Sequence, residues 1–505
     1  MAQLTFGTDG WRDVIADGYT FANVRRAARA YAAYLRTAEA GAGDAPVVVG
    51  YDTRFMAREF AFQVAQVLQV EGRRALVSSS YLPTPALSFA VKHLGAAGGV
   101  MLTASHNPPR YGGFKLKGPY GGTATDDIYR AVAALVPDSD VPEPAPGNMA
   151  APGVTVAQQI DTFDIRADYY AAITALVDID AIARAMPTIA HDSLGGAGSG
   201  WLTGLAEATR AFDVVPLRGR PDPLFHGVNP EPIPANLATT QEWMRSADAR
   251  RTGALFATVT DGDADRIGVV LPGGEYFNSH QIFAVLLDHL AATATGRVVK
   301  TFTVSRIIER LAAARGLEVV ETPVGFKYIV DAMLANDSGA AAVDDGAQGG
   351  AVLIGGEESG GIGVKGHVPE RDAIANTLLL LEAVVTSGAS LAERFAAIER
   401  EVGLTHAYDR VDLHLAADGT KERVMGRLTG GDADAVIGRP WRVTSVEDRD
   451  GVKLNLARDG DAEPTAWLLV RASGTEPVLR LYCEAPDDGA VATLLGAAQR
   501  FVTAR

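Results

Sequence analysis

The sequence predicts an α/β protein of three domains with mixed, mostly parallel sheets, followed by a smaller C-terminal α+β domain with an antiparallel sheet. Two patterns lead to this fold class. Over roughly the first 400 residues, short apolar strand candidates alternate with helical patterns, and such alternation is typical of parallel sheets covered on both faces. After Gly403, strand candidates follow one another directly, with hairpin signals such as "DRDG", which indicates an antiparallel sheet.

The first domain shows the alternation most clearly. In "FANVRRAARAYAAYL" the apolar residues recur at helical spacing, at Phe21, Val24, Ala28, Tyr31 and Leu35. "PVVVGYD" then predicts a buried strand, and "REFAFQVAQVLQVEG" a helix that ends at Gly72. "RALVSS", "TPALSFAVKHLG" and "AGGVMLTAS" continue the pattern.

Changes of composition suggest where the domains meet. The segment from Pro137 to Gly153 is rich in proline, alanine and acidic residues and predicts a linker or an exposed loop. We therefore expect domains at residues 1–155, 156–273, 274–403 and 404–505.

Charge and cysteine content narrow the class of protein. The net charge is −15, which argues against nucleic acid or an anionic membrane as a partner because both attract basic surfaces. The single cysteine, Cys483, cannot form an internal disulfide, and its apolar surroundings predict a buried strand residue. The amino-terminal residues lack the pattern of a secretory signal. We expect a soluble cytoplasmic protein, monomeric or homodimeric.

The segment "TASHNPPRYGGFK" follows the apolar strand candidate that ends at Leu102. Ligands of parallel sheets bind beyond the carboxyl ends of the strands, so Ser105 is expected to face a crevice. Small neighbours and prolines predict an accessible hydroxyl on a rigid loop. An ordinary strand-to-loop turn is the alternative.

The segment "DGDADRIG" carries three aspartates at alternate positions, Asp261, Asp263 and Asp265. Their carboxylates could turn towards one hard cation such as Mg²⁺. The spacing resembles the start of a calcium loop, but the later glutamate is missing and apolar strand candidates flank the segment. A solvated acidic turn remains the alternative.

Two further polar segments are rich in glycine or hydroxyl groups. "GGEESGGIGVKGH" offers Glu357 and Ser359 as acceptors for sugar hydroxyls, or forms a flexible hairpin. "RASGTEPVLRL" has the composition of a phosphate site, with Arg471 and nearby hydroxyls, or is a turn between strands. A hydroxyl nucleophile, a divalent cation, sugar acceptors and a phosphate anchor together indicate phosphoryl transfer on a phosphorylated polyol.

These four segments, together with "FGTDGWRD" and "VGFKYI", resemble the signatures of the α-D-phosphohexomutase family in order and spacing. The resemblance implies four domains around a central cleft and a phosphoserine at Ser105. It also implies reversible transfer of phosphate between the 1 and 6 positions of a hexose, with hexose 1,6-bisphosphate as intermediate and activator.

The resemblance also implies roles for individual residues. Ser105, Lys115, Arg12 and His106 would be catalytic, and Ser105 would join Asp261, Asp263 and Asp265 in holding Mg²⁺. Lys115 can act as general acid–base if neighbouring cations lower its pKa. Substrate would be bound by Arg266, Lys327, Glu357, Ser359, Arg471, Ser473, Gly474, Thr475 and Arg480.

Several alternatives within and outside the family stay open. Phosphoglucomutase activity is expected first, with phosphomannomutase or dual activity as the alternative and glucosamine phosphate as a less favoured substrate. Gly361 and Ala472 depart from the histidine and proline common in related enzymes, so no histidine role is expected in the segment of Glu357. A non-catalytic sugar-phosphate-binding protein is the contrasting class. A metal-dependent phosphatase with an aspartate nucleophile would leave Ser105 unexplained.

Overall fold

The structure is a computed structural model, and it describes residues 4–7, 9–37, 43–139, 141–142, 160–337, 351–415, 420–429, 436–472 and 478–503. Most of the predicted linker, from Pro137 to Gly153, lies outside these residues. The chain divides into two compact units, one of residues 1–299 and 325–392 and one of residues 300–324 and 393–505.

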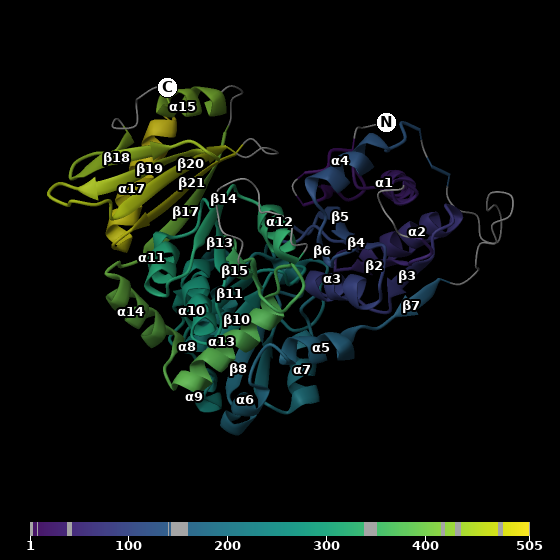
Figure 1. The fold of residues 1–505 in the computed structure, drawn as a ribbon, viewed down its shortest axis with the longest axis horizontal. Coiled ribbons are helices and arrows are strands. Elements are labelled where there is room, and N and C mark those ends of the chain that lie inside the picture. Colours follow the sequence, from purple (N-terminus) through teal and green to yellow (C-terminus); the bar gives the residue numbers. More distant parts are fainter. Residues whose placement is uncertain are drawn as a thin grey trace. The chain divides into compact units, whose positions relative to one another are not determined.

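The first sheet has seven strands and is mixed (Figure 1). The central strands pair in parallel, and a hairpin adds antiparallel strands at one side. Along the sheet the strands are β1 (Trp11–Val14), β5 (Tyr111–Gly118), β4 (Gly98–Leu102), β2 (Val47–Tyr51), β3 (Ala75–Ser78) and β7 (Asp161–Phe163), with β6 (Gly122–Thr123) beside β5. The helices around it are α1 (Phe21–Leu35), α2 (Ala57–Val70), α3 (Thr84–His93) and α4 (Asp126–Ala134).

Helix α1 shows why the local sequence specifies these elements. The Thr20 hydroxyl accepts the Asn23 N–H at 3.3 Å and caps the helix. The residues of the predicted apolar stripe at Val24, Ala28 and Leu35 are buried in the core of this domain. The helix begins and ends where the sequence predicts.

The second sheet has five strands, and it places the aspartate segment in the turn between β10 and β11. Its strands lie in the order β12 (Tyr276–Phe277), β11 (Ile267–Val270), β10 (Ala257–Thr260), β8 (Thr188–Asp192) and β9 (Asp213–Leu217). The accompanying helices are α5 (Arg166–Thr174), α6 (Ile179–Ala185), α7 (Trp201–Thr209), η2 (Phe225–Gly227), η3 (Pro234–Asn236), α8 (Ala238–Arg245) and α9 (Ala247–Thr252). The prediction that the aspartates lie between two apolar strands is confirmed.

The third sheet has four strands, in the order β14 (Val319–Thr322), β13 (Arg297–Thr301), β15 (Val352–Gly356) and β16 (Ile362–Val364). Strands β15 and β16 pair antiparallel, so Glu357 and Ser359 lie in the turn that joins them. The helices of this region are α10 (Ser279–Ala291), α11 (Arg306–Ala314), α12 (Phe326–Asp337), α13 (Ala373–Ser387) and α14 (Leu391–Val402).

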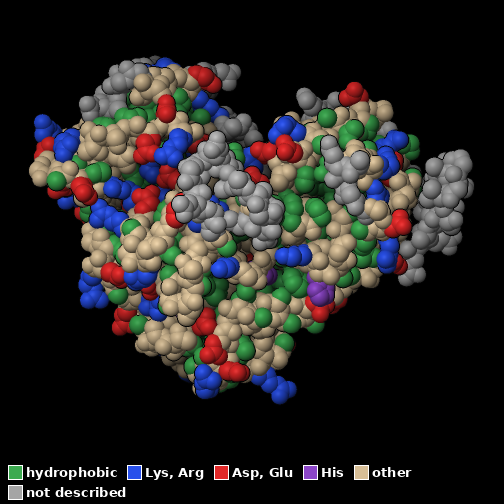
Figure 2. All heavy atoms as spheres, viewed as in Figure 1, with side chains coloured by type: hydrophobic (Ala, Val, Ile, Leu, Met, Phe, Trp, Pro, Cys, Tyr) green, Lys and Arg blue, Asp and Glu red, His purple; other side chains and the backbone are tan. Residues whose placement is uncertain are grey.

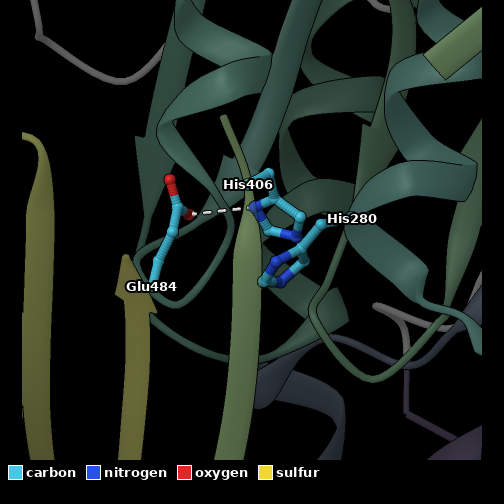
Figure 3. A group of neighbouring side chains, drawn as sticks. All are labelled: His280, His406 and Glu484. Carbon is cyan, nitrogen blue, oxygen red and sulfur yellow. Dashed lines mark ion pairs between the residues drawn. The ribbon is translucent and has the colours of Figure 1, made fainter. Parts of the chain in front are cut away.

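The fourth sheet is antiparallel, which confirms the predicted change of architecture after Gly403. Its five strands are β17 (Ala407–His414), β21 (Val478–Ala485), β20 (Ala466–Ala472), β19 (Val452–Arg458) and β18 (Trp441–Glu447), accompanied by α15 (Thr420–Thr429) and α17 (Asp488–Thr503). Cys483 is buried in β21, as predicted. Figure 3 shows the side chains of His406 and Glu484 of the same unit, with His406 Nδ1 3.7 Å from a carboxylate oxygen of Glu484.

Acidic and basic side chains lie interspersed over the face drawn in Figure 2. Among the described helices, none by itself has the length and apolar character of a membrane span. Among these helices, only the successive pair α13 and α14, which is bent at a short break, has that length and apolar character when the two are taken together.

The second sheet carries a buried histidine that should make the stability of the protein depend on pH. His191 in β8 is 3% exposed, and burial lowers its pKa to about 4. In the unfolded chain the histidine has a pKa of about 6.5. The contribution of the neutral His191 to the free energy of unfolding is therefore fully present above that pH and is lost as the pH falls towards 4. Between pH 7 and pH 5 we expect a loss of about 2 kcal/mol from this residue.

Denaturant unfolding of the wild type and of His191→Gln at the two pH values measures this loss. The neutral glutamine should remove about 2 kcal/mol of the pH dependence. Equal pH dependence in both proteins would contradict a buried neutral His191.

Candidate active site

Ser105 lies in the loop that joins β4 to β5. Its backbone N–H donates to the Thr103 hydroxyl at 2.9 Å, and its φ of 50° is in the left-handed region. That conformation costs a non-glycine residue about 1 kcal/mol or more. The hydroxyl donates to Asp261 Oδ2 at 2.8 Å. The expectation of an accessible hydroxyl is wrong, since Ser105 is only 1% exposed. The turn that carries Asp261 covers it, a contact 156 residues away in sequence.

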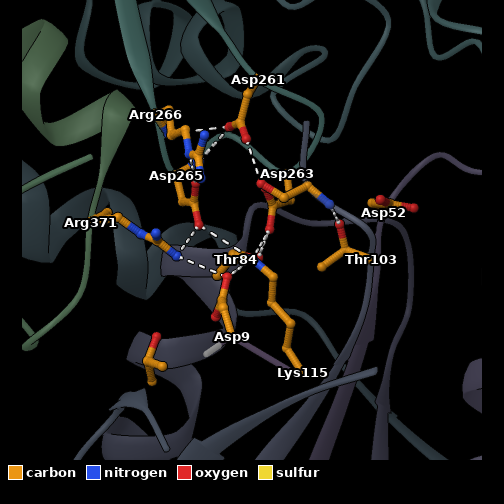
Figure 4. A network of polar contacts seen from close by, with 12 residues as sticks. Asp9, Asp52, Thr84, Thr103, Lys115, Asp261, Asp263, Asp265, Arg266 and Arg371 are labelled. Atoms are coloured by element: carbon orange, nitrogen blue, oxygen red, sulfur yellow. Dashed lines mark hydrogen bonds and ion pairs between the residues drawn. The ribbon is translucent and has the colours of Figure 1, made fainter. Parts of the chain in front are cut away.

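The three aspartates converge as the alternate spacing predicts. All three are fully buried, and their oxygens lie within 4.8 Å of one another. Asp261 Oδ1 accepts the backbone N–H groups of Asp265 and Arg266 at 3.0 and 3.2 Å, which closes the turn. Figure 4 shows the group together with Lys115. A solvated acidic turn is thereby excluded.

Electrostatics show why this cluster favours a cation. Burial, reinforced by Asp265 and Asp263, raises the pKa of Asp261 well above its ordinary value. Burial also acts to raise the pKa of Asp263, but Lys115 and a hydrogen bond from Thr84 lower it below its ordinary value. Within the described residues, Asp263 Oδ1 and Asp265 Oδ1 are buried without a hydrogen-bond partner. Unsatisfied carboxylate oxygens at this spacing fit a hard divalent cation.

Lys115 does not have the cationic surroundings that were expected to lower its pKa. Its ammonium lies 2.9 Å from Asp9, 2.9 Å from Asp263 and 3.4 Å from Asp265. Burial acts to lower the pKa of Lys115, but these three carboxylates outweigh it and raise the pKa above the ordinary value. The expectation that cations lower its pKa is therefore wrong, because its strongest neighbours are anions from other loops. Strand pairing fixes its position, with Lys115 opposite Met101 of β4.

Arg371 and Asp9 belong to the same network, although the sequence analysis gave neither a role. The Arg371 guanidinium lies 2.7 Å from Asp265, 3.3 Å from Asp9 and 3.3 Å from Glu357. Figure 4 shows Arg371 beside Asp265 and Asp9, and its contact with Glu357 joins the aspartate cluster to the predicted sugar-binding segment. Asp9 lies within "FGTDGWRD", which the resemblance had marked. For Arg371 the only local signal is its place soon after "GEESGG".

Thr84 is a third residue that sequence reasoning missed. Its hydroxyl donates to Asp263 Oδ2 at 2.6 Å, and its backbone N–H donates to the Asp263 carbonyl at 2.9 Å. Both donors stand at the start of α3. The first domain thus orients a carboxylate of the second.

Glu357 and Ser359 follow β15 and lie close to the second sheet. Gly360, at a φ of 89°, accepts the Ile267 N–H at 3.1 Å, and a side chain there would meet the Ile267 carbonyl at 2.4 Å. Burial raises the pKa of Glu357, with Arg371 opposing that effect. The Ser359 hydroxyl oxygen is buried without a partner in the part of the chain that the structure describes. An unpaired buried hydroxyl points to a polar ligand.

Other predicted residues occupy the edges of this site. Arg12 donates to Asn107 at 2.8 Å and to Asp9 at 3.2 Å, and His106 follows Ser105 and is half-buried. Arg266 lies 3.8 Å from Asp265. Lys327, by contrast, forms an ion pair with Asp126 at 2.7 Å, which is not one of the predicted site residues.

The predicted phosphate segment belongs to the second unit. Arg471 and Arg480 lie opposite each other on β20 and β21, with Asp450 2.9 Å from Arg471 and Asp412 3.8 Å from Arg480. Ser473, Gly474 and Thr475 lie outside the described residues.

Known proteins share this organisation along the whole chain. Profiles of the phosphoglucomutase/phosphomannomutase family match its alpha/beta/alpha domain I at residues 3–141, domain II at 167–274, domain III at 278–401 and C-terminal domain at 445–498. A phosphoglucomutase/phosphomannomutase of Thermococcus kodakarensis is 29% identical over 486 residues, covering 96% of this chain and 95% of its own. A provisionally named phosphoglucosamine mutase of Methanothermobacter thermautotrophicus is 30% identical over 479 residues, covering 95% and 93%.

A solved structure agrees with these sequence matches. The crystal structure of a Thermus thermophilus protein, provisionally named phosphomannomutase, is 40% identical, covers 100% of both chains and superposes with a TM-score of 0.83. The chain therefore belongs to the phosphoglucomutase/phosphomannomutase family, the α-D-phosphohexomutases, and is a phosphotransferring mutase of the isomerase class.

Proposed function

We propose that this chain is a phosphoglucomutase that moves phosphate between the 1 and 6 positions of glucose, with Ser105 carried as phosphoserine. One contact supports this most directly: the Ser105 hydroxyl donates to Asp261 Oδ2 at 2.8 Å, inside a cluster of three buried aspartates. An isolated serine turn would not need the carboxylates, and an aspartate-nucleophile phosphatase would not need the serine. A non-catalytic binding protein would need neither the serine nor the aspartates close to a buried lysine such as Lys115.

The residues around Ser105 suit transfer of a phosphoryl group. Its hydroxyl hydrogen is directed at Asp261, which would take that proton as the serine oxygen bonds to phosphorus and return it when phosphoserine gives up its phosphoryl group. When the phosphoryl group leaves glucose 1,6-bisphosphate, the sugar oxygen needs a proton, and Lys115 holds one because its pKa is raised by three carboxylates. Lys115 would recover a proton from the sugar hydroxyl that attacks phosphoserine in the opposite half of the cycle.

Charge neutralisation is the second requirement, because phosphoserine and substrate phosphate are both dianionic. Lys115 and Arg371 bring positive charge to the cluster, while Arg12 and Arg266 lie at its edge. Mg²⁺ bound by Asp261, Asp263 and Asp265 would polarise the phosphoryl group. The paired arginines at 471 and 480 would hold the phosphate that is not being transferred.

Glu357 and Ser359 are proposed to bind the 3- and 4-hydroxyls of the sugar. Both hydroxyls are the same in glucose and mannose, which differ only at the 2-hydroxyl. We therefore expect activity on glucose 1-phosphate, weaker activity on mannose 1-phosphate and activation by glucose 1,6-bisphosphate. A phosphomannomutase, or an enzyme with both activities, is the alternative.

A coupled assay with glucose 1-phosphate, mannose 1-phosphate and glucosamine 1-phosphate tests this assignment. Glu357→Gln should lower the turnover of glucose and mannose substrates by similar factors, of about tenfold to a hundredfold for a lost charge-assisted hydrogen bond. Glu358→Gln, its half-buried neighbour, is the matched control and should keep wild-type turnover. A selective loss of one sugar would show that Glu357 reads the 2-hydroxyl. Preferred turnover of glucosamine 1-phosphate, or turnover of none, would refute the proposed substrate.

A further inference from the structure

A buried arginine outside the predicted site holds the loop that carries Ser105. Arg54 is 4% exposed, and its guanidinium donates four hydrogen bonds to backbone carbonyls of this loop. The acceptors are Ser105 and Asn107 at 2.6 Å each, Pro108 at 2.8 Å and Tyr111 at 3.0 Å. One planar side chain therefore satisfies carbonyls on both sides of the two prolines.

Asp52 fixes this arginine to the sheet. Asp52 directly follows β2, and its backbone N–H donates to the Leu102 carbonyl of the neighbouring strand at 3.1 Å. Its carboxylate accepts the Arg54 Nε–H at 3.1 Å and the Arg54 backbone N–H at 2.9 Å. Arg54 Cζ lies 4.8 Å from the centroid of the Phe225 ring, over which the guanidinium packs.

Thr103 holds the backbone of Ser105 from its other side. The Thr103 hydroxyl accepts the Ser105 N–H at 2.9 Å. Figure 4 shows Asp52 and Thr103 beside the aspartate cluster. The Ser105 N–H is thus held by Thr103, and the Ser105 carbonyl is held by Arg54, which Asp52 orients.

This support matters because Ser105 has a left-handed φ of 50°, which a serine does not adopt by preference. We propose that Arg54, fixed by Asp52, is a positioning residue that holds the Ser105 backbone in this conformation and so directs its oxygen at the reacting phosphorus. The proposal rests on the proposed phosphoserine function. A lysine could not replace Arg54, because it lacks the planar set of donors.

Arg54→Lys tests the positioning role, with Arg218→Lys as the matched control. Arg218 is a half-buried arginine beside a strand-end aspartate, with its side chain 9% exposed and its Nε 3.0 Å from Asp192, and it donates to the Asn236 carbonyl at 3.2 Å. It follows β9 of the second sheet, and none of its side-chain hydrogen bonds or ion pairs among the described residues reaches residues 105–111. Both variants should lose stability. Only Arg54→Lys should lower kcat, by about a hundredfold as expected for a misplaced reacting group, with KM within about threefold of wild type.

Hydrogen exchange supplies a readout that does not depend on catalysis. The amides of Asn107 and Tyr111 donate within the loop, to the Ala104 and Pro108 carbonyls at 3.0 Å each. Their exchange should quicken by about tenfold or more in Arg54→Lys and stay at the wild-type rate in Arg218→Lys. Asp52→Asn keeps an oxygen that can accept a hydrogen bond from Arg54. It should therefore lower kcat and quicken amide exchange, but by smaller factors than Arg54→Lys. This variant tests the proposal if Arg54→Lys does not fold.

The two hypotheses fail in different ways. A wild-type protein that never acquires phosphate on Ser105 would refute the proposed function, and faster exchange in Arg54→Lys would still show that Arg54 holds the loop. An active wild type, with equal kcat and equal loop exchange in Arg54→Lys and Arg218→Lys, would overturn the positioning role.

Discussion

Ser105→Ala should abolish mutase activity, by about 10⁴-fold or more, because it removes the oxygen that accepts and returns the phosphoryl group. After incubation with glucose 1,6-bisphosphate, the intact mass of the wild type should include one added phosphate, and that of the variant none. The fold should survive. The cost should be about 1–3 kcal/mol, since Asp261 Oδ2 loses the hydroxyl hydrogen that it accepts.

A buried serine of the second domain supplies the control for this experiment. Ser199 is fully buried, and its hydroxyl lies 2.9 Å from that of Ser193. Ser199→Ala should retain activity and still acquire one phosphate. Turnover in Ser105→Ala, or phosphate on another residue, would end the phosphoserine mechanism.

Asp263→Asn should lose most of its affinity for Mg²⁺ and lower kcat by about a hundredfold or more. Its Oδ2 accepts hydrogen bonds from Thr84 and Lys115, and its Oδ1 has no hydrogen-bond partner among the described residues. Replacing the carboxylate with an amide removes one negative charge from the proposed cation site. Titration calorimetry with Mg²⁺ on the metal-free proteins gives the affinity independently of turnover.

Asp192→Asn is the matched control for this second substitution. Asp192 is also fully buried in the second sheet, at the end of β8, and pairs with Arg218. Its substitution should lower stability but leave the affinity for Mg²⁺ unchanged. EDTA should silence the wild type reversibly. Full activity of the wild type in EDTA, or unchanged Mg²⁺ binding in Asp263→Asn, would contradict the proposed metal role.

Much of the fold could be predicted because its causes are local. Helix α1 follows from an apolar stripe and a threonine cap within 16 residues, and the turn of Asp261, Asp263 and Asp265 follows from apolar residues on either side of it. The antiparallel sheet after Gly403 follows from adjacent strand patterns joined by hairpin turns. In each case the spacing of the apolar side chains and the residue types at the ends of the helix or strand are enough to predict the element.

The partners of the site residues could not be predicted in this way. Asp9 and Arg371 are 362 residues apart, and Thr84 and Asp263 are 179 apart. Arg54 looks like an ordinary charged residue after a strand, yet it donates to four carbonyls of the loop that carries Ser105. Contacts of this kind depend on how the loops of different sheets meet, and no local periodicity records that.

By itself, the sequence determined the fold class, the family resemblance and the strand ends that carry Ser105 and the three aspartates. Only the tertiary structure decided the burial of Ser105 and the charge on Lys115. From the sequence, an acid–base role for Lys115 was expected if neighbouring cations lowered its pKa, whereas the folded chain surrounds it with Asp9, Asp263 and Asp265, which raise its pKa. The physical reason is that a pKa depends on distances of a few ångströms between charges, and those distances are set by packing between loops remote in sequence.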